Sequence, residues 1–249
     1  MRYPAAGLDW TYGRLVGFDL ETTSTDPHSA RIVTGSVVGY GGGQPTSVRT
    51  WLSDVGGSQI PTAASAVHGV TTEAARSAGR PAPAVVEEIT ATLAGLVEEG
   101  HPLAIMSAPY GLTVLDREAR WYGITPLGDR VSPVVLDPLV LDRRVRKWAQ
   151  GPRTLERLCR HYVVPLDEDA HSSEADATAV CELVRRMGRR HALLAKSSPA
   201  RLHQRQVGWA REQGEDLRAY FARTPGKEAW ARDVRLDWPL LPLRREGGR

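Results

Sequence analysis

The chain has 249 residues and a formal net charge of +3, from 32 basic and 29 acidic residues. Apolar residues make up 41% of the chain and charged residues 24%, which excludes collagen-like, coiled-coil and wholly disordered proteins. The two cysteines are too few for a disulfide framework, and no apolar run reaches the ~18 residues of a membrane span. We therefore expect a cytoplasmic protein with no membrane partner, and the small net charge indicates nucleic acid only weakly.

Three antiparallel strands are predicted at the start of the chain, at residues 14–20, 31–40 and 46–52. Apolar residues at helical spacing then alternate with two short apolar runs. The expected helices are 83–98, 108–122 (with Ser107 as its N-cap), 138–147, 153–162 and 172–191, and the expected strands are 102–106 and 132–137. This order predicts an α/β fold, a mixed five-stranded sheet flanked by helices, in residues 1–195. Residues 196–249 are expected to form a C-terminal helical extension with a helix near 200–222 and an irregular tail.

Asp19 and Glu21 lie where the first predicted strand ends. Residues i and i+2 of a strand point to the same face, so we expect the two carboxylates side by side. A divalent cation that prefers oxygen ligands, Mg²⁺ or Mn²⁺, would relieve their repulsion. Two solvated acids at a strand end are the alternative, and a D-x-E pattern taken alone favours that alternative.

His171 and Asp176 are a second pair of candidate catalytic residues. His171 follows a loop, and Asp176 lies in the first turns of a predicted helix. Asp176 is expected to point back towards the loop, which would place a metal ligand and a base beside one attacking water. Taken alone, a histidine near a helix start is more often a surface residue.

Four segments together carry a family resemblance: FDLETTSTDP at 18–27, AVHGVTTEAAR at 66–76, SAPYGLTVLDRE at 107–118 and H-x4-D at 171–176. Over about residues 12–192 the chain resembles the DEDDh 3′–5′ exonucleases of the ribonuclease H-like superfamily. It is most similar to the proofreading epsilon subunits of bacterial DNA polymerase III. The resemblance implies a ribonuclease H-like fold and hydrolysis of phosphodiester bonds at single-stranded 3′ ends of nucleic acid.

The resemblance also assigns roles to individual residues. It implies metal ligation by Asp19, Glu21 and Asp176, with His171 as the general base. Substrate-binding positions implied by the family motifs are Thr22, Thr23, His68 and Ser107. For His68, a structural role in its loop is an equal alternative. The family uses two Mg²⁺ or Mn²⁺ ions.

The chain departs from the family at one metal-supporting position, because Gly111 stands where the second motif has an aspartate. Ser107 likewise replaces the usual asparagine. Asp116 lies roughly 140° around the helix from position 111 and should face away. Asp137, at a strand end, is a better geometric candidate for a substitute, although capping of the following helix is the alternative.

Two hypotheses follow from this departure. The first is a metal-dependent 3′–5′ exonuclease that is impaired or specialised, with the second metal site in doubt. The second is a catalytically inactive pseudo-exonuclease that binds nucleic-acid ends or a partner protein. The first is preferred because the other four site residues remain. A further alternative is another phosphodiester substrate, such as a nucleotide second messenger or an RNA end.

Basic and aromatic residues outside these motifs allow two interpretations. Arginines 143, 144, 146 and 153, with Lys147 and Trp148, form the densest basic cluster, which either tracks a nucleic-acid backbone or is a solvated surface. Arginines interleaved with Trp209, Tyr220 and Phe221 either stack bases or belong to a helix that packs on the main domain. That helix is also a candidate contact for a homodimer. Cys159 and Cys181 are expected in the core.

Overall fold

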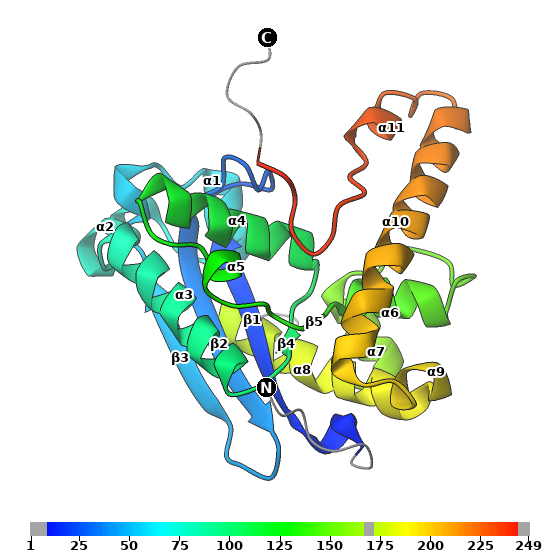
Figure 1. Cartoon of the computed structure of the whole chain (residues 1–249). Coiled ribbons are helices and arrows are strands. Elements are labelled where there is room, and N and C mark those ends of the chain that lie inside the picture. The colour runs from blue at the N-terminus through cyan, green and yellow to red at the C-terminus, as the bar shows by residue number, and fades with distance from the viewer. Residues whose placement is uncertain (1–8, 167–171, 244–249) are drawn as a thin grey trace.

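A mixed five-stranded sheet forms the centre of the protein, in a computed structural model that describes residues 9–166 and 172–243. The strand order is β3-β2-β1-β4-β5. The strands are β1 (Arg14–Thr22), β2 (Ile32–Gly41), β3 (Ser47–Leu52), β4 (Leu103–Ala104) and β5 (Val135–Leu136). β1, β2 and β3 pair antiparallel, and β4 and β5 are parallel to β1 (Figure 1). The expected α/β fold and mixed sheet are confirmed, with β4 and β5 shorter than expected.

The larger helices also agree with the expected order. They are α3 (Ala82–Glu98), α4 (Ala108–Trp121), α6 (Pro138–Val145), α7 (Leu155–Tyr162), α8 (Ser173–Arg190) and α10 (Pro199–Arg223). Short helices that the sequence did not predict are α1 (Thr62–His68), α2 (Thr72–Ala78), α5 (Leu127–Arg130), α9 (Ala192–Ala195) and α11 (Trp230–Asp233). Among the described residues, no helix is both long and apolar enough to cross a membrane.

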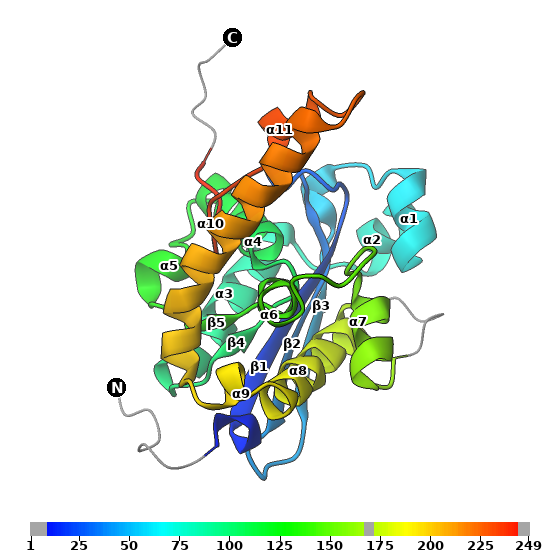
Figure 2. The same ribbon diagram turned by 90° about the vertical axis from the view of Figure 1, so that its right-hand side faces the viewer.

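Helices cover both faces of the sheet, with α8 on one face and α3 and α4 on the other (Figures 1 and 2). Successive residues of β1 alternate between these faces. Gly17 lies against the backbone of Ala177 in α8, whereas the Phe18 ring faces α4 near Gly111. Asp19 and Glu21 share the side of Gly17, so the strand directs both carboxylates towards α8. Cys159 and Cys181 are buried free thiols, as expected.

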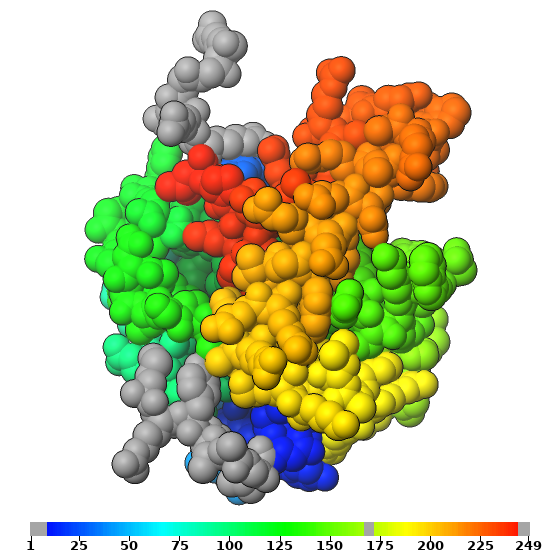
Figure 3. Space-filling model, turned by 45° about the vertical axis from the view of Figure 1, so that its right-hand side comes forward, coloured from blue at the N-terminus to red at the C-terminus, as the bar shows by residue number. Residues whose placement is uncertain are grey.

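The C-terminal helix α10 covers the edge strand β5. The Gln206 side chain accepts a hydrogen bond from the Asp137 amide (2.9 Å) and donates one to the Val135 carbonyl (2.9 Å). His203 Nδ1 accepts from the Val135 amide (3.1 Å). These side chains take the place of a neighbouring strand, which removes an exposed sheet edge. Figure 3 shows α10 running across this face, with the C-terminal segment packed beside it.

Packing of α10 against the main domain accounts for some of the aromatic and basic residues in the C-terminal extension. Trp209 is buried, and the Arg144 guanidinium lies 5.3 Å from the centroid of its ring. The structural interpretation therefore holds for Trp209 and His203, whereas Tyr220 and Trp230 remain exposed near the far end of α10.

Candidate active site

Three carboxylates meet at the end of β1, beside the first turn of α8. Asp19 and Glu21 come from β1 and Asp176 from α8, and one oxygen from each lies within 4.8 Å of the others. All three residues are partly exposed, so a solvent-borne ion can reach them. The structure thus brings together the three residues that the sequence predicted as metal ligands, although Asp176 is 155 residues from Glu21 in the chain.

Polar contacts fix the first turn of α8 at this position. The Ser172 side chain caps the helix by accepting from the Ala175 amide (3.2 Å). The buried Ser173 hydroxyl lies 2.7 Å from the Ser36 hydroxyl and 3.3 Å from that of Thr34, both on β2. Since Asp176 follows Ser173 by one helical turn, these contacts hold its backbone beside β1.

Electrostatic repulsion within the cluster is visible at Asp19. Burial raises the pKa of this carboxyl well above its ordinary value of 3.8, and the charges of Asp176 and Glu21 raise it further. The backbone hydrogen bond to Leu20 opposes this shift in the pKa only in part. An acidic group in this environment gains from a nearby cation, which favours its ionised form.

The segment after Glu21 is joined to α4 by Tyr110. The Tyr110 hydroxyl contacts the Thr22 hydroxyl and donates a hydrogen bond to the Ser24 carbonyl. Burial raises the pKa of Tyr110, and the charges of Glu21 and Asp19 contribute, which shows that the phenol lies near the acidic cluster. Tyr110 was not among the site residues predicted from the sequence, although its place in the 107–118 segment beside Gly111 was a signal.

Two further residues of the predicted substrate-binding set, Thr23 and His68, have structural contacts of their own. Thr23 is buried, and its hydroxyl accepts from the Arg31 amide (2.9 Å), so its side chain holds the turn into β2. His68 ends α1, and its Nδ1 accepts from the Val70 amide (3.2 Å). Burial lowers the pKa of His68, and the nearby Thr22 backbone partly opposes this. The HGVT segment is therefore adjacent to the end of β1.

The cap of α4 differs from the expectation. Ser107 occupies the N-cap position in a left-handed conformation (φ 55°), and its side chain makes no capping hydrogen bond. Asp137 supplies the cap instead, because its carboxylate accepts from the amides of Ser107 (3.3 Å) and Ala108 (2.9 Å). A carboxylate distant in sequence replaces the local serine, which the local pattern could not indicate.

Neither candidate substitute for the missing aspartate is in the acidic cluster. Asp137 is buried and also accepts from the Leu139 amide (2.9 Å), so the prediction that it caps the following helix is confirmed. Asp116 forms an ion pair with Arg120 (3.0 Å). A β-carbon added at Gly111 would lie 3.9 Å from both Phe18 and Ile105, an ordinary contact distance.

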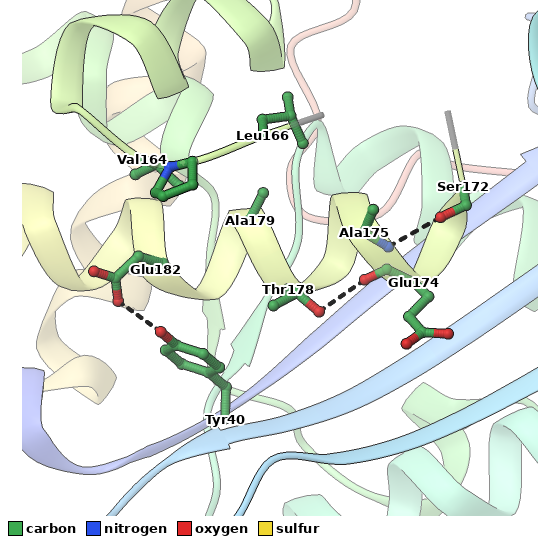
Figure 4. A pocket seen from close by; sticks show the side chains of 10 residues that line it. Tyr40, Val164, Leu166, Ser172, Glu174, Ala175, Thr178, Ala179 and Glu182 are labelled. Carbon is green, nitrogen blue, oxygen red and sulfur yellow. Dashed lines mark hydrogen bonds between the residues drawn. The ribbon is translucent and has the colours of Figure 1, made fainter. Parts of the chain in front are cut away.

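His171, the predicted general base, lies outside the described residues. A cavity of about 450 Å³ borders this region, between α8 and residues 164–166. Figure 4 shows Tyr40 and Glu182 on its floor, joined by a 2.9 Å hydrogen bond. Its lining includes Glu174 and Ala175 from the first turn of α8 but none of the three clustered carboxylates.

Solved structures of exonucleases share this fold. Exonuclease I from Methylocaldum szegediense superposes with a TM-score of 0.58 at 17% identity over 84% of this chain. Exonuclease I from E. coli, solved with an oligonucleotide, gives 0.56 at 14% over 84%. Exonuclease X, solved with 5′ overhanging duplex DNA, gives 0.52 at 15% over 78%. The sequence matches no family model and no curated protein.

The matched exonucleases differ in how much of their own length this chain covers. This chain spans 46% and 45% of the two exonuclease I chains and 98% of the exonuclease X chain. At such low sequence identity the likeness concerns the fold, which is the ribonuclease H-like fold of these exonucleases. The structure therefore places three clustered carboxylates in a fold that exonucleases I and X also adopt.

Proposed function

We propose that this protein is a metal-dependent 3′–5′ exonuclease that removes nucleotides from single-stranded DNA ends. The observation that carries the proposal is the convergence of Asp19, Glu21 and Asp176 within 4.8 Å. Their arrangement in a fold shared with exonucleases that bind DNA supports it. Four sequence segments that resemble the DEDDh family, and its epsilon branch in particular, support it independently.

The donor chemistry at this site fits Mg²⁺ or Mn²⁺. Asp19, Glu21 and Asp176 offer only carboxylate oxygens, the hard ligands that these ions prefer. Burial, and then the charges of Asp176 and Glu21, raise the pKa of Asp19, and a bound cation would favour its ionised form. A bound ion would supply Lewis-acid stabilisation of charge on the phosphate oxygens.

Other residues would act on the substrate and the attacking water. We assign His171, five residues before Asp176, the role of the base that removes a proton from that water. Thr22 and His68 are adjacent at the end of β1, and we propose that both border the terminal nucleotide. Thr23 and Ser107 belong to the same family motifs and are further candidates. Tyr110 holds the Thr22 segment through its hydroxyl.

The position of Gly111 favours a second candidate, a protein that binds single-stranded ends without cleaving them. Asp116 is paired with Arg120, and Asp137 caps α4 and α6, so neither is available as a fourth acid. In the family, that acid supports the second metal. Loss of several kcal/mol of transition-state stabilisation would lower the rate by orders of magnitude.

Metal titration with a labelled oligonucleotide separates the two candidates. The exonuclease shortens a 5′-labelled single strand from its 3′ end in Mg²⁺ or Mn²⁺, and Asp176→Asn abolishes this. The control Asp116→Asn, which removes an acid outside the cluster, retains cleavage. If no cleavage occurs at any concentration of either ion while the strand still binds, the exonuclease proposal is wrong and the binding function stands.

A further inference from the structure

The basic cluster around the turn between α6 and α7 separates into groups with different partners. Arg144 and Lys147 face α10, where they lie 3.7 Å from Glu212 and 3.6 Å from Asp216. Those two side chains are exposed but have carboxylates of α10 as partners, so each of their positive charges is balanced within the protein.

Arg146 and Arg153 of this cluster line a cavity of about 310 Å³, together with two arginines of α7. Among the residues that the structure describes, its charged lining consists of Arg146, Arg153, Arg157 and Arg160 and includes no acidic residue. The turn projects from the surface beneath the far end of α10 (Figures 1 and 3). A concave site lined by guanidinium groups has the donor geometry that phosphate oxygens match.

One buried carboxylate holds two of these arginines in place. Asp142 accepts from Arg146 (3.1 Å), from Arg153 (2.8 Å) and from the Tyr162 hydroxyl (2.8 Å). Arg153 also donates to the Arg146 carbonyl (2.9 Å), which braces the turn. Asp142 thus balances one of the two positive charges and fixes the position of both guanidinium groups.

Arg157 has no such partner. Within the described residues its guanidinium makes no hydrogen bond or ion pair, and it lies over Gly151, where a β-carbon would come within 2.7 Å of it. Gly151 has φ 87°, so glycine suits both the turn and this close approach. Arg146 and Arg153 share the single carboxylate of Asp142, so together with Arg157 these three side chains carry two positive charges in excess.

A neutral donor site adds to this pocket. His161 lines the cavity, and its buried Nε2 has no hydrogen-bond partner among the described residues. A buried polar nitrogen without a partner is costly, and a bound oxyanion would satisfy it. The charge excess and the unsatisfied nitrogen therefore indicate the same kind of ligand.

We propose that this pocket binds a backbone phosphate of the single strand whose 3′ end occupies the acidic cluster. This inference rests on the proposed function. α7 packs against α8, the helix that carries Asp176. At 100° per residue, Arg157 and His161 lie about 160° around α7 from the buried Cys159, so the pocket is on the side of α7 that faces away from that buried contact.

Binding of fluorescein-labelled dT12 in EDTA, followed by anisotropy at several salt concentrations, tests the proposal without cleavage. Arg157→Gln is expected to weaken binding about fivefold and to reduce the slope of log K against log salt by about 0.7, the value for one phosphate contact on a single strand. Arg157→Lys should keep that slope. The control Arg201→Gln, an exposed arginine of α10, should bind as the wild type does.

Unchanged affinity and slope in Arg157→Gln would overturn the proposal, as would an equal loss in Arg201→Gln. A parallel titration with inorganic phosphate identifies the source of the ligand. If phosphate stabilises the wild type but not Arg157→Gln while dT12 binding is unchanged, the pocket binds free phosphate and the backbone proposal is wrong. Arg157-dependent binding of dT12 without any cleavage in Mn²⁺ would leave this pocket supported and refute only the exonuclease.

Discussion

Gly17 of β1 lies directly beneath Ala177 of α8, and this contact sets how closely the helix approaches the strand. A β-carbon at Gly17 would clash with the Ala177 carbonyl and lie 2.9 Å from Cys181 Sγ. Asp19 and Asp176 flank this contact. Asp19 is two residues after Gly17 on the strand, and Asp176 is one residue before Ala177 on the helix. The closeness of strand and helix is thus a condition for the acidic cluster.

Gly17→Ala is therefore expected to destabilise the protein by about 1–3 kcal/mol, the usual cost of overpacking, and to weaken metal binding because α8 must move away. Urea unfolding and calorimetric Mn²⁺ titration measure the two effects. Gly95→Ala in α3 is the matched control, since nothing lies within 4 Å of its added methyl group. Normal metal affinity in Gly17→Ala would show that the contact does not set the cluster geometry.

Asp19→Asn should stabilise the metal-free protein at neutral pH. The folded-state pKa of Asp19 is raised above its ordinary 3.8, so the stability that its protonated form provides is lost as pH rises from about 4 through that raised pKa. The difference in Tm between Asp19→Asn and wild type, measured in EDTA, is expected to grow over this pH range.

The same variant should lose its response to metal. Wild type is expected to gain Tm on addition of Mn²⁺, because ligand binding favours the folded state, and Asp19→Asn should not. Asp233→Asn, an exposed acid on α11, serves as the control. A Tm difference that stays constant from pH 4 to 8 would argue against repulsion within the cluster.

Asp137→Asn tests whether Asp137 has a structural role or is a metal ligand. The Asp137 carboxylate caps α4 and α6 and accepts from Trp238 Nε1 (3.3 Å). Loss of the charged acceptor should cost about 1–3 kcal/mol of stability. The number of Mn²⁺ ions bound, measured by titration below the unfolding temperature, should not change. A lost ion would identify Asp137 as the substitute acid.

Gly111→Asp should raise cleavage if the missing aspartate limits activity. The added β-carbon fits at ordinary contact distance from Phe18 and Ile105. Gly111→Ala is the control, because it tests helix propensity and packing without a carboxylate. The comparison is the cleavage rate in Mg²⁺ for the three proteins. If both variants cleave at the wild-type rate, the absent acid is not the limiting feature.

The sequence alone determined the strand and helix order, because alternating and helical apolar patterns are local signals. Asp19 and Glu21 were predictable as a pair from strand periodicity, and Asp176 from its family motif. The two seven-residue helices α1 and α2 were not predicted, since so short a segment contains too few turns to show periodicity.

Only the tertiary structure decided which groups distant in the chain share a role. Asp137, 30 residues from Ser107 in the chain, accepts from the amides of Ser107 and Ala108 at the start of α4, where the Ser107 side chain makes no capping bond. Carboxylates of α10 balance the charges of Arg144 and Lys147, whereas Arg157 has no ion pair within the described part of the chain. Such outcomes depend on distances between elements, which a pattern along the chain does not contain. The spacing of β1 and α8, set by the absence of a side chain at Gly17, is the clearest case.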